Sequence, residues 1–223
     1  MAAADAATPA QLTPAEGRVR LAALRPAVSG ATDLARARGR LPSGPGLPSR
    51  MPGDPPLFVG SSAHACDVDG LERLGITAVL NVAPSVCRDP VTKYISRGIT
   101  YFQLEARDDR TFAIIEECLP RAREFVAAAH ARGRGVLIHC MAGVNRSATL
   151  AVAYLLLRDR VQLLELFAQC VAARPSILQN AHFQLQLCVL AEQNGLLCDP
   201  DKGHKAAAPK SRQNHPHPAL HTL

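Results

Sequence analysis

The stretch HCMAGVNRSA, residues 139–148, places several residues that could do chemistry within one short segment. Cys140 is a nucleophile once its thiol is ionised, and Arg146 carries a planar guanidinium that can bind two oxygens of a phosphate. Gly143 permits a tight turn in which consecutive backbone N–H groups form a nest for an anion. The segment therefore predicts a loop that binds an oxyanion and presents a thiol to it.

The residues on either side of the segment predict how it is positioned. GVLIH (135–139) has no polar alternation, which is typical of a central strand in a parallel sheet. TLAVAYLLLRD (149–159) is apolar nearly all round, which is typical of a buried helix. A helix that begins near Asn145 offers unpaired N–H groups and the positive end of its dipole to an anion. The same field favours the thiolate form of Cys140 at neutral pH.

A thiolate that faces a bound phosphate predicts one reaction. Cys140 attacks phosphorus and forms a phosphocysteine, which water then hydrolyses without a metal or another cofactor. Ser147 is placed to hydrogen-bond the sulfur and ease its departure, and His139 is expected to hold the loop by bonding to backbone. The residues expected to bind the phosphate are Met141, Ala142, Gly143, Val144, Asn145 and Arg146.

Other interpretations of these residues are weaker. The nucleotide-binding pattern GxxxxGK[ST] is absent. A zinc site at His139 and Cys140 is disfavoured because adjacent side chains project differently and no second ligand pair is near. An odd number of cysteines with apolar neighbours, and no signal peptide, indicates reduced thiols in the cytosol or nucleus. The six cysteines interpreted as buried structural residues are Cys66, Cys87, Cys118, Cys170, Cys188 and Cys198.

Charge and composition divide the chain into a domain and two flanks. Residues 1–50 carry seven arginines and three acidic residues, whereas residues 51–200 carry 14 basic and 15 acidic residues. We expect a disordered Ala/Arg/Pro-rich region at 1–50, a folded domain at 51–198 and a disordered basic tail at 199–223. The near-neutral domain argues against a nucleic-acid partner. No apolar run approaches the roughly 20 residues of a membrane span, so no membrane association is expected.

The tail contains three closely spaced histidines that could hold a metal. A solvated tail is the preferred interpretation, because the segment has no fixed geometry and metal sites need one. These residues are His215, His217 and His221.

Strands and helices alternate through the central domain. The expected strands are 57–60, 76–82, 99–104 and 135–139. The expected helices are 63–75, 112–133, the apolar helix after the loop, about 161–173 and 179–194, with Pro120 kinking the second of them or beginning its second half. This order predicts an α/β fold with a central, mostly parallel sheet flanked by helices. Ligands of such sheets bind at the carboxyl ends of the strands, where Cys140 lies.

HCMAGVNRSA resembles the signature loop of the cysteine-dependent protein tyrosine phosphatases, in particular of their small, atypical dual-specificity branch. The resemblance runs from about residue 55 to 195, through LFVGS, LGITAVLNVA, GITYFQLEARDD and ARPSILQNAHFQLQL. It implies a protein tyrosine phosphatase-like fold and a hydrolase of phosphotyrosine and phosphoserine or phosphothreonine. Asn145 departs from the family, because many relatives have Ser or Tyr there.

The resemblance also implies a general acid. The family uses an aspartic acid upstream of the loop to protonate the leaving oxygen and then to activate water. Aligning without gaps from Phe112 to Cys140 puts Asp108 at this position, with Asp109 as the alternative.

Three functions remain open: a dual-specificity protein phosphatase, a phosphatase of the same fold for phosphoinositides or RNA 5′-phosphates, and a catalytically silent phosphate-binding scaffold. Keeping Cys140, Arg146 and an upstream Asp argues against the scaffold. The loop carries no Lys for a multiply phosphorylated lipid, and a near-neutral domain does not favour RNA. The short link from Leu104 to Phe112 predicts a shallow cleft, which would admit both long and short phosphorylated side chains of a phosphoprotein.

Overall fold

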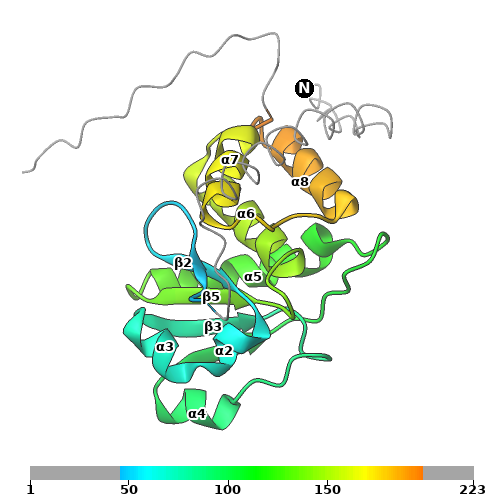
Figure 1. The fold of residues 1–223 in the computed structure, drawn as a ribbon. Helices are drawn as coiled ribbons and strands as arrows, with labels where there is room; N and C mark the ends of the chain where they lie inside the picture. Colours follow the sequence, from blue (N-terminus) through cyan, green and yellow to red (C-terminus); the bar gives the residue numbers. More distant parts are fainter. Residues whose placement is uncertain (1–45, 198–223) are drawn as a thin grey trace, which may run out of the picture.

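The structure, a computed structural model, describes residues 46–197 (Figure 1). The expectations for residues 1–45 and 199–223, including the three tail histidines, lie outside the described residues, as does Cys198. One sheet has the strand order β1-β2-β5-β3-β4. The strands are β1 (Ser49–Arg50), β2 (Leu57–Gly60), β3 (Ile76–Asn81), β4 (Thr100–Gln103) and β5 (Gly135–His139).

The strand that precedes the loop, β5, is central and runs parallel to β2 and β3. β4 continues the parallel part beyond β3, and β1 pairs antiparallel with β2 at the other edge. This arrangement confirms the predicted α/β fold with a mostly parallel sheet.

Helices cover both faces of the sheet (Figure 1). Their bounds are α2 (Ser62–Cys66), α3 (Val68–Arg73), α4 (Val91–Ser96), α5 (Ile114–His130), α6 (Arg146–Asp159), α7 (Leu163–Ala173) and α8 (Ala181–Gln193). Side chains alternate along β5: Val136 and Ile138 join the core that contains α5 to α8, whereas Leu137 joins the smaller core under α2, α3 and α4. Both faces of the central strand are therefore buried, which explains its unbroken apolar sequence.

The helix after the loop, α6, is the centre of the larger core. Every residue from Ser147 to Leu156 is buried, and α6 contacts α5, α7, α8 and the strands β2 and β5. This confirms the buried helix expected from its apolar sequence. Among residues 46–197 no helix is both long and apolar enough to cross a membrane.

The prediction of one helix over 63–75 is wrong, because Asp67 separates α2 from α3. Its carboxylate accepts a hydrogen bond from the Gly70 N–H at 2.9 Å and caps the start of α3. α5 is one helix that continues through Pro120.

Two elements were not predicted. α4 is short and is held by Tyr94, whose hydroxyl donates to the carbonyl of Ala65 at 2.6 Å. β1 contains only two residues, and it shows that the sheet begins before residue 51, where we expected the domain to start.

We predict that α6 contributes strongly to stability through Leu150, which is completely buried. Leu150→Ala should lower the free energy of unfolding by about 2–5 kcal/mol, because a cavity remains where the side chain was. Ile95→Ala is the control, since Ile95 is 73% exposed and should change stability by less than about 0.5 kcal/mol. Urea denaturation measures both variants, and equal losses would contradict the prediction.

Candidate active site

The loop at 140–145 connects the central strand β5 to the buried helix α6 (Figure 1). β5 ends at His139, which is paired with Gly60 at the end of β2 and with Asn81 at the end of β3. Three chain segments therefore emerge side by side at the carboxyl edge, and Cys140 begins the central one. This is where parallel sheets place their ligands.

The carbonyl oxygens of the loop face away from its centre. Those from Met141 to Val144 all accept hydrogen bonds from outside the loop: from the backbone N–H of Ser62 (3.2 Å), the guanidinium of Arg174 twice (3.1 and 2.7 Å), and the N–H of Leu178 (2.8 Å). Within residues 46–197, no N–H group from Met141 to Val144 donates to another residue. With the carbonyls turned outward, these N–H groups can bind an anion inside the loop.

Gly143 makes this turn possible. Its φ is +69°, in the left-handed region that favours glycine. A Cβ atom here would lie 2.4 Å from the carbonyl oxygen of Gly60, in the neighbouring chain segment. Both the backbone conformation and the close approach therefore require glycine.

Cys140 lies at the base of the loop, where its side chain is only 2% exposed. Its Sγ is 3.3 Å from the Oγ of Ser147, in the first turn of α6, as expected from the sequence. Burial raises the pKa of Cys118 to about 11 and that of Cys170 to about 12, so these thiols stay protonated. Cys140 lies instead beside the first turn of α6, and the N-terminus of a helix is a place where a bound anion is favoured.

Arg146 connects the loop to the segment that contains the candidate general acid. One Nη donates to the carbonyl of Ala106 at 3.1 Å, two residues before Asp108. The Nε of Arg146 is buried, and it has no hydrogen-bond partner within the described part of the chain. A buried guanidinium donor without an acceptor suits an oxyanion ligand.

His139 does not bond to backbone as expected. Its Nε2 lies 2.9 Å from a carboxylate oxygen of Asp89, whose side chain is 1% exposed. The same oxygen accepts from the side-chain amide of Asn81 at 2.7 Å. His139 is the last residue of a central strand with both faces covered, so its ring points into buried space where this carboxylate is the available partner.

The two adjacent carboxylates, Asp108 and Asp109, have different surroundings. Asp109 accepts hydrogen bonds from the backbone N–H groups of Thr111 and Phe112, both at 2.8 Å, and pairs with Arg107 at 3.0 Å. These contacts, the Thr111 N–H above all, hold the pKa of Asp109 well below its usual range and keep it ionised. Asp108 is bonded to side-chain amides of the loop region instead, so it lies beside the loop and is the better candidate for a proton donor.

The comparisons with known proteins agree with this geometry. The family model described as "Dual specificity phosphatase, catalytic domain" matches residues 57–193. The chain belongs to this family. It is 37% identical over 143 residues to human dual specificity protein phosphatase 13B, covering 63% of this chain and 72% of that protein. It is 34% identical over 138 residues to Drosophila melanogaster dual specificity protein phosphatase Mpk3, covering 61% and 32%.

Solved structures support the same assignment for the fold of this dual specificity phosphatase domain. The crystal structure of human DUSP28 superposes with a TM-score of 0.56 at 26% identity, covering 68% of this chain and 98% of that one. The chain spans about a third of the length of Mpk3, so the relatives extend beyond the shared catalytic domain.

Sequence reasoning missed Arg174, which supports the phosphatase loop from outside. It lies in the ARPSILQN segment, which the resemblance included without giving this arginine a role. Burial lowers the pKa of Arg174, whereas the nearby Cys140 raises it. Its ordinary pKa is so high that the guanidinium stays charged. The partners of Arg174 are backbone carbonyls, which every residue has, so no residue type in the sequence indicates the contact. Only the folded structure shows that Arg174 lies next to the loop.

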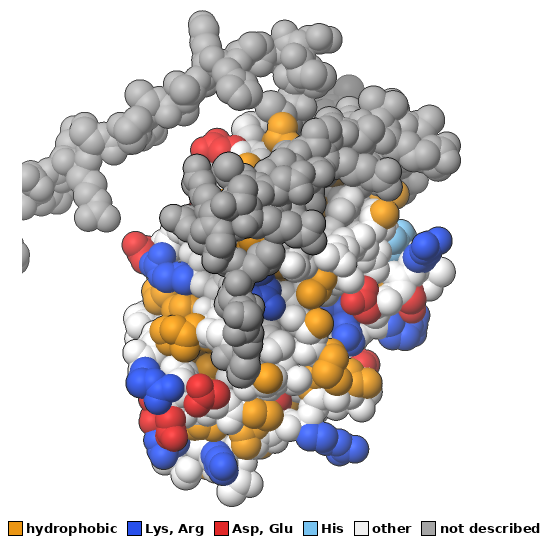
Figure 2. All heavy atoms as spheres, viewed as in Figure 1, with side chains coloured by type: hydrophobic (Ala, Val, Ile, Leu, Met, Phe, Trp, Pro, Cys, Tyr) orange, Lys and Arg blue, Asp and Glu red, His pale blue; other side chains and the backbone are white. Residues whose placement is uncertain are grey.

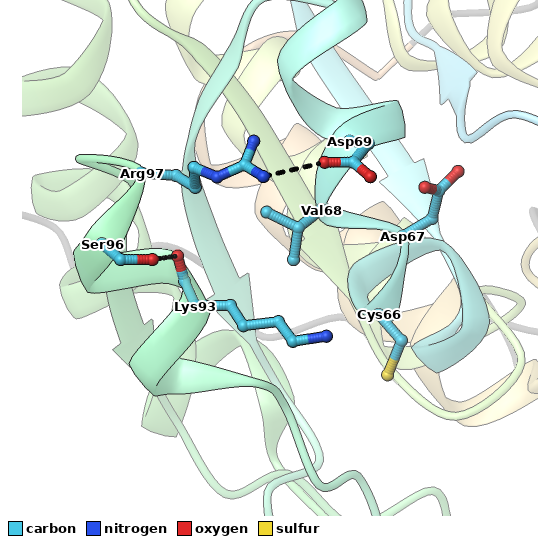
Figure 3. A pocket seen from close by; sticks show the side chains of 7 residues that line it. All are labelled: Cys66, Asp67, Val68, Asp69, Lys93, Ser96 and Arg97. Carbon is cyan, nitrogen blue, oxygen red and sulfur yellow. Dashed lines mark hydrogen bonds and ion pairs between the residues drawn. The ribbon is translucent and has the colours of Figure 1, made fainter.

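A hollow of about 290 Å³ lies elsewhere on the domain, between α3 and α4 (Figure 3). It is lined by Cys66, Asp67, Val68, Asp69, Lys93, Ser96 and Arg97. None of the predicted catalytic residues lines it. Arg97 pairs with Asp69 at 3.2 Å and also with Glu72, so its charge is already compensated.

We predict that Gly143 cannot be replaced without loss of the anion-binding loop. Gly143→Ala should destabilise the domain and weaken binding of tungstate, a phosphate analogue, because the Cβ displaces the loop from Gly60. Gly133→Ala is a matched control: its φ is also positive, at +68°, but nothing lies within 4 Å of its Cβ. The control should lose about 1–2 kcal/mol from backbone strain alone. Gly143→Ala should lose about 1–3 kcal/mol more. Denaturation and calorimetry measure these quantities, and equal behaviour of the two variants would refute the prediction.

Proposed function

We propose that this domain is a protein phosphatase that hydrolyses phosphotyrosine and phosphoserine or phosphothreonine through a phosphocysteine intermediate. The observation that carries the proposal is the loop itself. Its carbonyls are bonded outside, its N–H groups are left for an anion, and Cys140 lies at its base. The buried Nε of Arg146 also has no hydrogen-bond partner among residues 46–197. Membership of the family gives the same chemistry.

In the first step the Cys140 thiolate attacks phosphorus, and the S–P bond forms as the P–O bond to the substrate side chain breaks. The loop N–H groups and Arg146 bind the other three phosphate oxygens, and they stabilise the charge of the transition state. Asp108 gives its proton to the leaving oxygen, because an unprotonated phenolate or alkoxide leaves poorly.

In the second step water attacks the phosphocysteine. The Asp108 carboxylate accepts a proton from the water as the new O–P bond forms, and the S–P bond breaks. The departing sulfur becomes a thiolate again, and the Ser147 hydroxyl at 3.3 Å can stabilise it by donating a hydrogen bond. Inorganic phosphate then leaves. A thiol nucleophile of this kind works in the reducing cytosol or nucleus, where we propose the protein acts.

A phosphoprotein is the substrate class that the charge distribution favours. Among the described residues that are visible in Figure 2, basic and acidic side chains are interspersed and form no broad basic region. At the loop, Met141 is 44% exposed and carries no charge. A multiply phosphorylated lipid or an RNA end would favour added basic groups here.

A substrate panel tests this assignment directly. Phosphotyrosine, phosphoserine and phosphothreonine peptides, phosphoinositides and a 5′-phosphorylated RNA are assayed side by side at the same salt concentration. We expect the peptides to be preferred in kcat/KM, because residues 140–145 of the loop carry no Lys or Arg that could bind a second phosphate. A preference of tenfold or more in kcat/KM for the lipid or the RNA would contradict the proposal that the substrate is a phosphoprotein. Turnover of none of them would favour a phosphate-binding scaffold.

We predict that Cys140 carries the covalent step. Cys140→Ser should reduce turnover of an aryl phosphate by more than about a thousandfold, because a serine hydroxyl is not ionised in this field. Tungstate binding should remain, since the loop N–H groups and Arg146 are unchanged. Cys66→Ser is the control, because Cys66 lies outside the loop and should leave turnover unaffected; its thiol is exposed, so the interpretation of Cys66 as a buried residue was wrong. Full activity of Cys140→Ser would exclude the mechanism.

We predict that Asp108, not Asp109, is the general acid. Asp108→Asn should slow a phosphotyrosine peptide by about 10²–10⁴-fold and an activated aryl phosphate far less, because the activated leaving group needs little protonation. Asp109→Asn is the matched control: asparagine keeps an oxygen that can accept from the Thr111 and Phe112 N–H groups. If only Asp109→Asn showed the selective loss of activity on the phosphotyrosine peptide, Asp109 would be the general acid instead of Asp108.

A further inference from the structure

The side chain of Asn145 faces away from the phosphate-binding interior of the loop. Its Oδ1 accepts hydrogen bonds from the backbone N–H groups of Gln179 (2.8 Å) and Asn180 (3.0 Å), in the segment between α7 and α8. Because the oxygen must face these two donors, the orientation of the amide is fixed and its NH₂ group must face the other way. There its Nδ2 lies 3.2 and 3.1 Å from the two carboxylate oxygens of Asp108.

A second amide reaches the same carboxylate. Asn180 caps α8, where its Oδ1 accepts from the N–H groups of His182 and Phe183. Its Nδ2 donates to Asp108 Oδ1 at 2.9 Å. Each of the two amides is therefore oriented by backbone N–H groups before it contacts Asp108. The two amides that bond the Asp108 carboxylate therefore have fixed orientations, and they fix the position of the carboxylate.

These two groups are neutral, which suits a residue that must alternate between acid and base. Among residues 46–197 Asp108 forms no ion pair, whereas Asp109 pairs with Arg107. A cation would favour only the carboxylate form, but an amide N–H can bond either a carboxylate oxygen or the carbonyl oxygen of a neutral acid. Oδ1 is within hydrogen-bond distance of both amides, whereas Oδ2 is contacted by Asn145 alone, so Oδ2 is the oxygen with fewer amide contacts and the one better able to carry the proton.

We propose that Asn145 is a positioning residue for the general acid, and that it determines how well the domain hydrolyses esters with poor leaving groups. This inference rests on the proposed function. Asn145 joins the phosphate loop, the Asp108 segment and the start of α8 through one side chain, so Asp108 is already in place when substrate binds. In this chain a serine could not make both sets of contacts, because one hydroxyl is too short to accept from the 179–180 segment and also donate to Asp108.

The inference has a consequence for substrate choice. The alkoxides of serine and threonine are poorer leaving groups than the phenolate of tyrosine, so their release depends more on a well-placed acid. Loss of the Asn145 contact should therefore narrow a dual-specificity enzyme toward phosphotyrosine and activated aryl phosphates.

The test compares Asn145→Ser with the unchanged protein on esters of increasing leaving-group pKa: an activated aryl phosphate, phenyl phosphate and a phosphoserine peptide. We expect kcat/KM to fall by about tenfold or more on the last two and by less than about threefold on the first. In an Asp108→Asn background, Asn145→Ser should cause no further selective loss, because the two residues act as one unit. Asn194→Ala is the control, since Asn194 lies at the opposite end of α8 and should change no substrate selectively.

Thermal melting and tungstate affinity show whether fold and loop remain intact. If Asn145→Ser does not fold, Asn145→Asp replaces it: the carboxylate keeps an acceptor for the 179–180 N–H groups but repels Asp108, and the same selective loss is expected. An equal loss on all esters, an undiminished selective loss in the Asp108→Asn background, or unchanged activity would overturn the inference. Inactivity of the unchanged protein on every phosphate ester would instead contradict the proposed function, and this inference with it.

Discussion

The hydrogen bonds from Arg174 to the loop carbonyls are the contacts on which the site depends. A loop that binds an anion must keep its carbonyl dipoles out of the binding site, and Arg174 holds those of Ala142 and Gly143 on the outside. The same guanidinium donates to Ser49 Oγ at 3.3 Å, so it also ties the edge strand β1 to the loop. Without this cation the loop could turn a carbonyl inward, where it would repel a phosphate.

Beneath the loop, the buried pair of Asp89 and His139 gives a second constraint. A fully buried histidine needs a hydrogen-bond partner, and the partner here is a carboxylate oxygen of Asp89, 2.9 Å from the Nε2 of His139. The carboxylate is itself held by Asn81, at the end of the neighbouring strand β3. These contacts fix the imidazole of His139 under the chain, so the residue next to it, Cys140, starts the loop from a rigid position. The structure therefore supports Cys140, the proposed nucleophile, from both sides, by a cation outside the loop and by a carboxylate beneath it.

The sequence predicted those parts of the site that depend only on residues close together in the chain. The apolar sequence of β5, the turn at Gly143 and the buried helix that begins at Arg146 follow from residue type and spacing alone. The partners of His139 and of the loop carbonyls could not be predicted, because Asp89 and Arg174 lie 50 and 31 residues away from the groups they bind. Short elements such as α4 form through tertiary contacts rather than propensity. The break at Asp67 did have a local signal, a carboxylate three residues before Gly70, that the helical pattern obscured.

The contrast between Asp108 and Asp109 shows how neighbouring groups of one chemical type acquire separate roles. Asp109 accepts from two backbone N–H groups and an arginine, so its charge is fixed and it closes the turn that leads to α5. Asp108, the residue before it, lies beside the loop instead. There the side-chain amides of Asn145 and Asn180, which carry no charge, donate hydrogen bonds to its carboxylate. A residue that must both release and accept a proton needs such neutral partners, because any strong bias toward one protonation state would slow one of the two steps. The ionised Asp109 therefore holds the turn, and the amides of Asn145 and Asn180 hold Asp108, the proposed general acid, beside the loop without an ion pair among residues 46–197.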